Sequence, residues 1–341
     1  TCVNPSPCLT IQRGIDVATE VDTIIVNPWN YVENININES SLTLKSDSGP
    51  SVTIINGSIN ISEAGHNFIL GGTDGVGFTI QNESSQDDAF IRIGTKANTL
   101  IENITIAYNN FSLSADFAYP TFGILILEAN ITNLNITGNI FWLNESYQTA
   151  IAADDVVDVS DVNIISNTFT VTSGENETTT RGIAIAVPNI NVSGTPFVIE
   201  GNTFTNLTQA IVIGNDSGDG IKAGDSFFLI NSNTFEYNNI SIDIVSASYS
   251  PANTSAQDIR ISNNNFSFSY DAAIGINTSL FTAVTLTFLD PTDFTIVNNT
   301  FLGNGIAINN NNSVDSTECA SLSVNAERNW WGNGTGPSRV F

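Results

Sequence analysis

The chain has 341 residues, of which 41% are apolar and only 13% are charged, and its nine Lys and Arg leave a formal net charge of −25. This balance disfavours nucleic-acid binding and a polybasic membrane contact, because both need clustered cations and the nine here are scattered. No apolar run approaches the roughly 20 residues of a membrane span.

The first 21 residues are expected to form an N-terminal cap. Within residues 9–20, Ile11, Ile15 and Ala18 lie at helical spacing, which predicts one short amphipathic helix. The chain begins at Thr1 and contains no Met, so we expect a mature chain whose signal peptide has been removed, or a cut segment.

Three cysteines are present. Cys2 and Cys8 flank two prolines, and we predict a small loop-closing disulfide between them; the alternative is three buried or unpaired thiols. Cys319 would then pair between chains or be buried.

Short β segments follow the cap. Residues 22–26 and 31–37 have the composition of strands around a turn at 27–30, and 42–44 and 52–55 are predicted as further strands. No second amphipathic helix of any length appears after residue 20. The predicted fold class is therefore all-β.

From residue 100 onward, one pattern recurs. Two apolar residues stand two positions apart, an Asn follows three positions later, and an aromatic residue stands two positions after the Asn. The eight aromatic residues are Phe111, Phe141, Phe169, Phe204, Phe235, Phe266, Phe301 and Trp331. The eight asparagines are Asn109, Asn139, Asn167, Asn202, Asn233, Asn264, Asn299 and Asn329. Their spacing of about 28 to 35 residues is typical of a solenoid.

The pattern predicts how each coil is built. The two apolar residues share one face of a strand because side chains alternate with period two. The Asn and the aromatic residue break that phase, and a corner at the Asn, which tolerates left-handed backbone, would let all four residues point inward. Stacked coils would then align the asparagines in a hydrogen-bonded ladder and the rings in a column.

Each pattern is followed by a second alternating segment that begins with a small residue, such as 123–126 or 182–185. Three short strands per coil without intervening helices predict a parallel β-helix of about ten coils. We expect a single domain over 1–341, with a cap at 1–21, coils at 22–320 and a C-terminal coil or cap at 321–341.

With these features the chain resembles the right-handed parallel β-helix proteins of the pectin-lyase-like superfamily, in particular surface and periplasmic members of the NosD type. The opening Leu9-Thr10-Ile11-Gln12…Asp22-Thr23-Ile24-Ile25-Val26…Leu42-Thr43-Leu44-Lys45 is similar to their cap and first coil. The ending Asn329-Trp330-Trp331-Gly332…Gly336-Pro337-Ser338 is similar to a motif at their C-terminal end. This resemblance implies the fold, but the fold hosts lyases, hydrolases, adhesins and structural shells.

Acceptor motifs for N-glycosylation are frequent, at about twice the number expected from composition alone. The acceptor asparagines are Asn38, Asn56, Asn60, Asn82, Asn103, Asn110, Asn130, Asn135, Asn144, Asn176, Asn191, Asn206, Asn215, Asn239, Asn253, Asn265, Asn277, Asn298, Asn311 and Asn333. None of the eight ladder asparagines is among them. The modifiable asparagines are therefore expected on outward faces and turns; the alternative is that composition alone explains their number.

Candidate catalytic groups are few. Asp154 and Asp155 form an acid pair that could serve in glycoside cleavage, or an acidic turn after a strand. In the polygalacturonase-like relatives, paired acids precede a His flanked by glycines and an Arg-x-Lys element. Here the single His, His66, precedes the pair, and Arg260-Ile261-Ser262 lacks the Lys, so the catalytic residues of these relatives are not transferred.

One loop resembles a calcium site. Asn215, Asp216, Asp219 and Asp225 place oxygen ligands in a Gly-rich segment, although Ser226 stands where a closing Glu is needed. The alternative is an ordinary Gly/Asp turn. No other cofactor is expected besides N-linked glycans.

These observations predict a secreted, heavily N-glycosylated, non-enzymatic structural protein of the cell surface or of an extracellular filament or sheath, with an archaeal surface component as the suggested source. Its partner would be other copies of itself, joined through the open edges at the solenoid ends. The alternative is a polysaccharide lyase or hydrolase, or a carbohydrate-binding adhesin.

Overall fold

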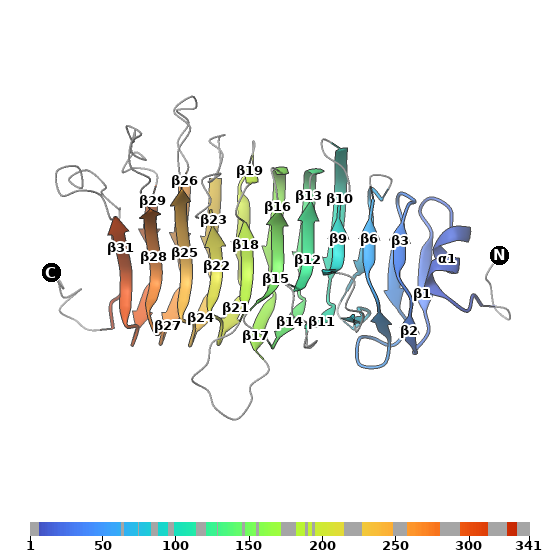
Figure 1. The fold of residues 1–341 in the computed structure, drawn as a ribbon, viewed down its shortest axis with the longest axis horizontal. Helices are drawn as coiled ribbons and strands as arrows, with labels where there is room; N and C mark the ends of the chain where they lie inside the picture. The colour runs from blue at the N-terminus through green and yellow to red at the C-terminus, as the bar shows by residue number, and fades with distance from the viewer. Residues whose placement is uncertain are drawn as a thin grey trace.

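A computed structural model describes residues 7–62, 65–73, 75–82, 88–94, 99–113, 121–127, 129–144, 147–154, 157–171, 182–187, 190–192, 195–214, 227–247, 258–279, 294–312 and 326–332. It is a parallel β-helix, as predicted (Figure 1). Three sheets run along the solenoid, and each coil adds one strand to each sheet.

Sheet 1 has 11 strands: β1 (Thr23–Val26), β4 (Thr43–Ser46), β7 (Ile69–Gly71), β10 (Thr99–Ala107), β13 (Ala129–Thr137), β16 (Val157–Ile165), β19 (Ile190–Val192), β20 (Phe197–Glu200), β23 (Phe227–Asn231), β26 (Asp258–Ser262) and β29 (Phe294–Val297). Sheet 2 has 10: β2 (Asn30–Val32), β5 (Ile54–Asn56), β8 (Thr79–Gln81), β11 (Asn110–Leu113), β14 (Ile140–Leu143), β17 (Thr168–Val171), β21 (Thr203–Thr205), β24 (Thr234–Glu236), β27 (Asn265–Ser267) and β30 (Thr300–Leu302). Sheet 3 also has 10: β3 (Ile35–Ile37), β6 (Ile59–Ile61), β9 (Ala89–Ile93), β12 (Thr121–Leu127), β15 (Gln148–Asp154), β18 (Ile183–Val187), β22 (Gln209–Ile213), β25 (Ile240–Ala247), β28 (Ala272–Ser279) and β31 (Ile306–Asn312).

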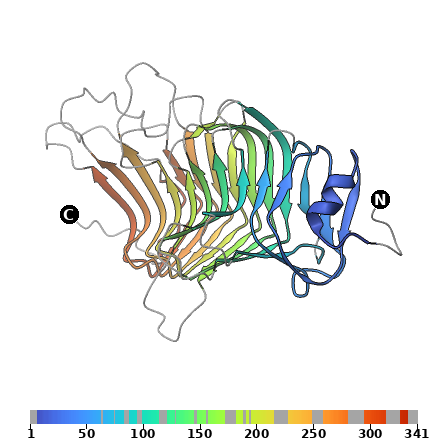
Figure 2. The same cartoon turned by 45° about the vertical axis from the view of Figure 1, so that its right-hand side comes forward.

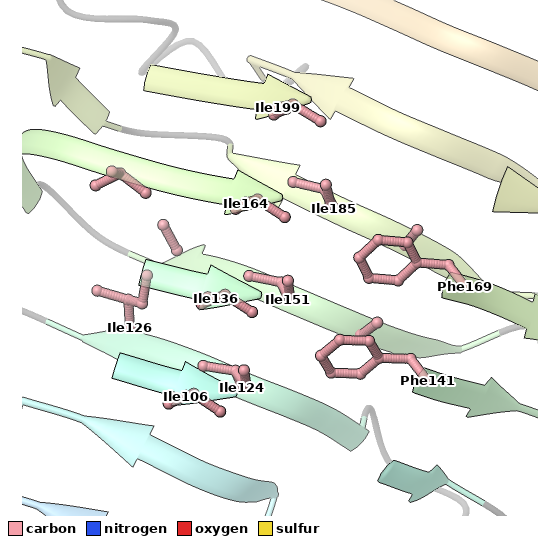
Figure 3. Close-up of a cluster of buried hydrophobic side chains, with 14 of the residues drawn as sticks. Ile106, Ile124, Ile126, Ile136, Phe141, Ile151, Ile164, Phe169, Ile185 and Ile199 are labelled. Atoms are coloured by element: carbon pink, nitrogen blue, oxygen red, sulfur yellow. The ribbon is translucent and has the colours of Figure 1, made fainter. Parts of the chain in front are cut away.

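The register of the sheets places like residues on like residues. In sheet 1, Ile106 pairs with Ile136, and Ile136 pairs with Ile164. Their side chains face the equivalent isoleucines of sheet 3 across the interior, such as Ile151 (Figure 3). Because each coil covers the next, one continuous apolar core runs the length of the solenoid.

The predicted asparagine ladder is present at all eight positions. Asn202 is typical: its backbone N–H donates to Asn233 Oδ1 at 2.9 Å, and its own Oδ1 accepts from the Asn167 backbone N–H at 2.8 Å. Its Nδ2 donates to the Ile164 carbonyl at 2.8 Å. The ladder therefore satisfies the polar groups that the tight corner leaves buried.

The aromatic column is also present. Neighbouring rings from Phe111 to Trp331 stack with centroids 4.4–5.0 Å apart and planes within 4–10° of parallel. Parallel register forces this near face-to-face spacing, because equivalent residues repeat at the distance between strands. The ladder occupies the corner between sheets 1 and 2, and the phenylalanines of the column project inward from the strands of sheet 2 beside it.

The position of the left-handed residue differs from the prediction. It lies one residue before each ladder Asn, for example at Tyr108 (φ 57), Ser166 (φ 57) and Arg328 (φ 59). The ladder Asn itself is not in the left-handed region, because its side chain is needed for the ladder rather than for the turn. The residue before it points outward, where different side chains are accepted.

The first coil contains a second difference. Residues 31–37 are not one strand: β2 ends at Val32 and β3 begins at Ile35, and the two belong to different sheets. The corner was hidden because Tyr31, Glu33, Ile35 and Ile37 keep the alternation of a single strand. Glu33 turns instead to the cap, where its carboxylate accepts hydrogen bonds from the backbone N–H groups of Ile11 and Gln12 at 2.8 and 3.0 Å.

The predicted capping helix is confirmed and is shorter than expected. Helix α1 (Ile11–Val17) buries Ile11 and Ile15 and packs on β1 and β3. Figure 2 shows it lying across the N-terminal end of the solenoid. In the part of the chain that the structure describes, no helix is both long and apolar enough to cross a bilayer.

Candidate functional surfaces

Because core residues fill the inward positions, a functional site would have to lie on the outward residues or at the ends of the solenoid. Asp154 is the last residue of β15 and lies opposite Leu127 of β12 in the register of sheet 3. Its side chain and the whole of Asp155 lie outside the described residues. The acid pair therefore stays a prediction.

The calcium-loop residues Asn215, Asp216, Asp219 and Asp225 also lie outside the described residues. Among the residues that are described, no group of three or more His, Cys, Asp and Glu side chains is placed to hold a metal ion. Cys8 is disulfide-bonded. Cys2 and Cys319 are not among the described residues, so the predicted Cys2–Cys8 pairing stays a prediction.

His66 has a structural position. Its Nδ1 accepts a hydrogen bond from the Glu102 backbone N–H at 3.1 Å, and its carbonyl accepts one from the Ser41 N–H at 2.7 Å. The ring therefore links neighbouring coils at the corner before sheet 1, as expected for a turn residue.

A buried acid on the outer face of sheet 3 was not foreseen. Asp243 is 4% exposed, and its Oδ2 accepts a hydrogen bond from Gln209 Nε2 at 2.6 Å. The pair was missed because its members are 34 residues apart and occupy different offsets in their repeats. Glycoside cleavage uses two carboxyl groups, whereas Gln209 contributes an amide, so the Gln209–Asp243 pair alone does not supply acid–base catalysis.

The outer face of sheet 3 also carries a small second apolar cluster. Ala89, Leu125 and Ala152 are buried there, and the partly buried Phe122 and Leu127 pack against them. Asp154 is the last residue of β15, the strand that carries Ala152. This cluster was not predictable from the sequence, because its residues alternate with core residues as outward positions normally do.

The acceptor asparagines with described side chains are mostly outside the core. Asn38, Asn103, Asn265 and Asn298 are exposed, and Asn56, Asn60, Asn110, Asn130, Asn135, Asn144, Asn206 and Asn239 are partly exposed. Asn82 is 3% exposed and is the exception. The side chains of Asn176, Asn191, Asn215, Asn253, Asn277, Asn311 and Asn333 lie outside the described residues. All eight ladder asparagines carry no acceptor motif, and seven of them are buried to 2% exposure or less: Asn109, Asn139, Asn167, Asn202, Asn233, Asn264 and Asn299.

A second, exposed polar ladder runs along sheet 1, at Asn67 before β7, Asn103 within β10 and Asn133 within β13. Asn133 Nδ2 donates to Asn103 Oδ1, and Asn103 Nδ2 donates to Asn67 Oδ1, both at 2.7 Å. All three residues have left-handed backbone, with φ of 54–59°. The amide of the acceptor Asn103 is thus held between its neighbours.

Large apolar side chains that remain exposed gather toward the two ends. On the cap and first coil these are Leu9, Val21, Ile25, Trp29 and Val32. On the last coils they are Tyr237, Phe268, Tyr270, Leu302, Ile306 and Trp330. Between the ends only Val52, Leu100, Trp142 and Tyr147 are exposed in this way among the described residues.

Comparison with known proteins identifies the architecture only. No family model matches the chain, and no curated protein matches it. Among solved structures, it is similar to the PL6-family alginate lyase AlyGC, with 13% identity and a TM-score of 0.48 over 94% of this chain. It is also similar to a PL6 alginate lyase in complex with a trisaccharide, with 12% identity and a TM-score of 0.37, the match covering 86% of this chain and 68% of the other.

A third similar structure is the catalytic domain of a GH87 α-1,3-glucanase in complex with tetrasaccharides, with 13% identity and a TM-score of 0.34, the match covering 96% of this chain and 70% of the other. The match to AlyGC covers only 38% of that enzyme. At these identities the likeness concerns the fold and does not extend to a site or an activity.

Proposed function

We propose that the protein is a secreted, N-glycosylated structural protein of the cell surface or of an extracellular filament, which assembles through the ends of its solenoid. The observation that carries this proposal is the gathering of exposed apolar side chains at the two ends. Exposed apolar patches mark interaction sites, whereas single exposed apolar residues are ordinary.

The two ends match along sheet 2. At the C-terminal end, Trp330 is 50% exposed and Leu302 is 42% exposed. At the N-terminal end, Trp29 is 71% exposed and Val32 is 75% exposed. Val32 follows the inward-facing Tyr31 in its strand as Leu302 follows Phe301, so a second copy placed end to end would continue the same outward row.

Helix α1 restricts where such a contact forms. It packs on β1 and β3 and leaves Trp29 and Val32, at β2, exposed. The aromatic column ends on Trp331, which stacks on Phe301 at 4.9 Å. Tyr31 of the next copy, which is partly buried at the equivalent strand position, would extend that column across the junction.

The surface chemistry supports an extracellular, glycan-bearing protein. Most acceptor asparagines with described side chains are at least partly exposed, and the buried ladder asparagines carry no acceptor motif. Arg92 and Asp88 form an ion pair. Because only 13% of the residues are charged, Asn, Ser, Thr and attached glycans are left to provide solubility.

The assembly is tested by sedimentation velocity and negative-stain microscopy over a range of protein concentrations. We expect concentration-dependent, end-to-end oligomers that Trp330→Glu and Val32→Glu each abolish. Trp142→Glu is the matched control, because Trp142 is 39% exposed on the middle of the same sheet and should leave assembly intact. A monomer at every concentration, or equal loss in the control variant, would refute assembly through the ends.

Glycopeptide mapping of the native material tests the extracellular, glycosylated part of the proposal. The same material should be incubated with uronate polymers and glucans. Release of oligosaccharides that Asp154→Asn or Asp155→Asn abolishes would replace the structural function with a polysaccharide-active enzyme.

A further inference from the structure

The corner between sheets 2 and 3 carries a column of outward side chains. Four residues there have left-handed backbone: Asn206 (φ 61), Tyr237 (φ 56), Phe268 (φ 56) and Gly303 (φ 65). Asn206 N–H donates to Glu236 O at 3.2 Å, Tyr237 N–H to Ser267 O at 3.1 Å and Phe268 N–H to Leu302 O at 2.9 Å. These bonds place the four residues one above another, one per coil.

The aromatic pair of this column ends beside Asn206. The rings of Tyr237 and Phe268 stack at 5.1 Å and 9°, and both are about 40% exposed. The far face of Phe268 is covered by the next coil, because a Cβ at Gly303 would lie 2.9 Å from its Cδ1 and Cε1. The far face of Tyr237 is turned toward the coil that carries Asn206.

The backbone beside Asn206 is fixed by burial and hydrogen bonding. Leu207, the next residue, is fully buried, and its N–H donates to Asn238 Oδ1 at 3.0 Å. Among the described residues, nothing forms a hydrogen bond with the Asn206 side-chain amide. Asn103, an acceptor within β10 of sheet 1, has both ends of its amide bonded within the exposed ladder.

We propose that Asn206 carries an N-linked glycan whose first sugar lies against the exposed Tyr237 ring. The acceptor motif is Asn206-Leu207-Thr208. Attachment forms a bond from Nδ2 to sugar C1 while the C1–O bond to a lipid-linked phosphate donor breaks; the phosphate leaves with the electron pair and Nδ2 loses one proton. The sugar's C–H face then packs on the negative face of the ring.

This inference rests on the proposed glycosylation and adds to it a specific contact. A sugar held by the ring would cover apolar surface that is otherwise exposed to water. It would also be less accessible to an enzyme that removes glycans. The contact therefore has a measurable signature that attachment alone does not have.

The test uses the full chain secreted from a glycosylating host. Glycopeptide mass spectrometry should find Asn206 occupied, and an endoglycosidase should release this glycan about two- to tenfold faster from Tyr237→Asn than from the unchanged protein. Asn is chosen because it accepts left-handed backbone, so the corner is retained. Tyr237→Phe keeps the ring face and should keep the slow release.

A glycan at Asn265 or Asn298 provides the internal reference, since Tyr237→Asn should not alter its release rate. If other acceptors are occupied but Asn206 is not, or if the Asn206 glycan leaves all three proteins at the same rate, this inference is wrong and the proposed function stands. If no acceptor is occupied in the native material, both are wrong.

Discussion

The adjacent residues Asn264, at the corner before β27, and Asn265, the first residue of β27, allow the contribution of the ladder to stability to be tested directly. Asn264 is 2% exposed and belongs to the ladder: its Oδ1 accepts from the Asn233 N–H at 2.8 Å, and its Nδ2 donates to the Ile230 carbonyl at 2.9 Å. Asn265 is exposed, and no described residue bonds its side chain. The two alanine variants therefore differ in the ladder and little else.

The expected loss of stability in Asn264→Ala follows from the buried polar groups that lose their hydrogen-bond partners. The Asn233 N–H loses its acceptor, and the Ile230 carbonyl loses the donated Nδ2–H. Each buried polar group left without a partner costs about 1–3 kcal/mol, and the small cavity adds to this, so we expect a loss of about 3–5 kcal/mol in the free energy of unfolding. Asn265→Ala should lie within about 0.5 kcal/mol of the unchanged protein.

The assay is urea unfolding followed by far-UV circular dichroism. The protein should come from a host without N-glycosylation, because Asn265 is itself an acceptor. Solenoid coils interact only with their neighbours, so a broadened transition would report that the damage is confined to the coils around Asn264. Equal urea midpoints for the two variants would refute the view that the ladder contributes to stability.

Three further predictions concern the core, a corner and the cap. Phe204 is fully buried between rings at 4.9 and 4.8 Å, so Phe204→Ala should cost about 3–5 kcal/mol in urea unfolding and Phe204→Leu clearly less; equal losses would contradict a packed column. Gly138 (φ 63) and Gly201 (φ 64) occupy the same corner position in different coils. A Cβ added at Gly138 would lie 2.7 Å from the Tyr108 ring, whereas one added at Gly201 would meet only Ser166 Oγ, at 3.5 Å. Gly138→Ala should therefore lower the urea midpoint more than Gly201→Ala, and the opposite order would show that the Tyr108 ring moves aside. The backbone and side-chain hydrogen bonds of Thr19 lower the pKa of the Asp22 carboxyl below its usual 3.8, so its contribution to stability is present above that value and is lost as the pH falls through the lowered pKa. Asp22→Asn should therefore be less stable than the unchanged protein at neutral pH, with the gap closing in acid; a pH-independent gap would exclude this linkage.

The coil architecture was predictable from sequence because its main columns repeat residue type as well as position. A buried amide and a buried ring at fixed offsets leave a pattern that survives changes of loop length. The left-handed residue before each ladder Asn was placed wrongly for the opposite reason. Its side chain points outward, and Tyr108, Gly138, Ser166 and Arg328 at this position share no property that a sequence pattern could detect.

The surfaces were less predictable than the core. The corner column at Tyr237 and Phe268 appears only once the coils are stacked, since Asn206 and Gly303 hold the same position with unlike side chains. The contact between Gln209 and Asp243 also could not be predicted from sequence, because the two residues occupy different offsets in their repeats. The corner inside 31–37 was missed because two strands in different sheets happened to keep one alternation.

The asparagine ladder gives an electrical direction to a solenoid built largely from uncharged residues. From Asn109 to Asn299, each backbone N–H of the ladder donates to the Oδ1 of the ladder Asn in the next coil, so the accepting Oδ1 atoms face the previous coil. Aligned amide dipoles add, as they do along an α-helix, so partial negative charge faces the N-terminal end and partial positive charge the C-terminal end. Like poles repel. Two copies meeting at equivalent ends would therefore oppose their dipoles, while copies in a row would align them, and a filament grown from this protein would have two chemically different tips.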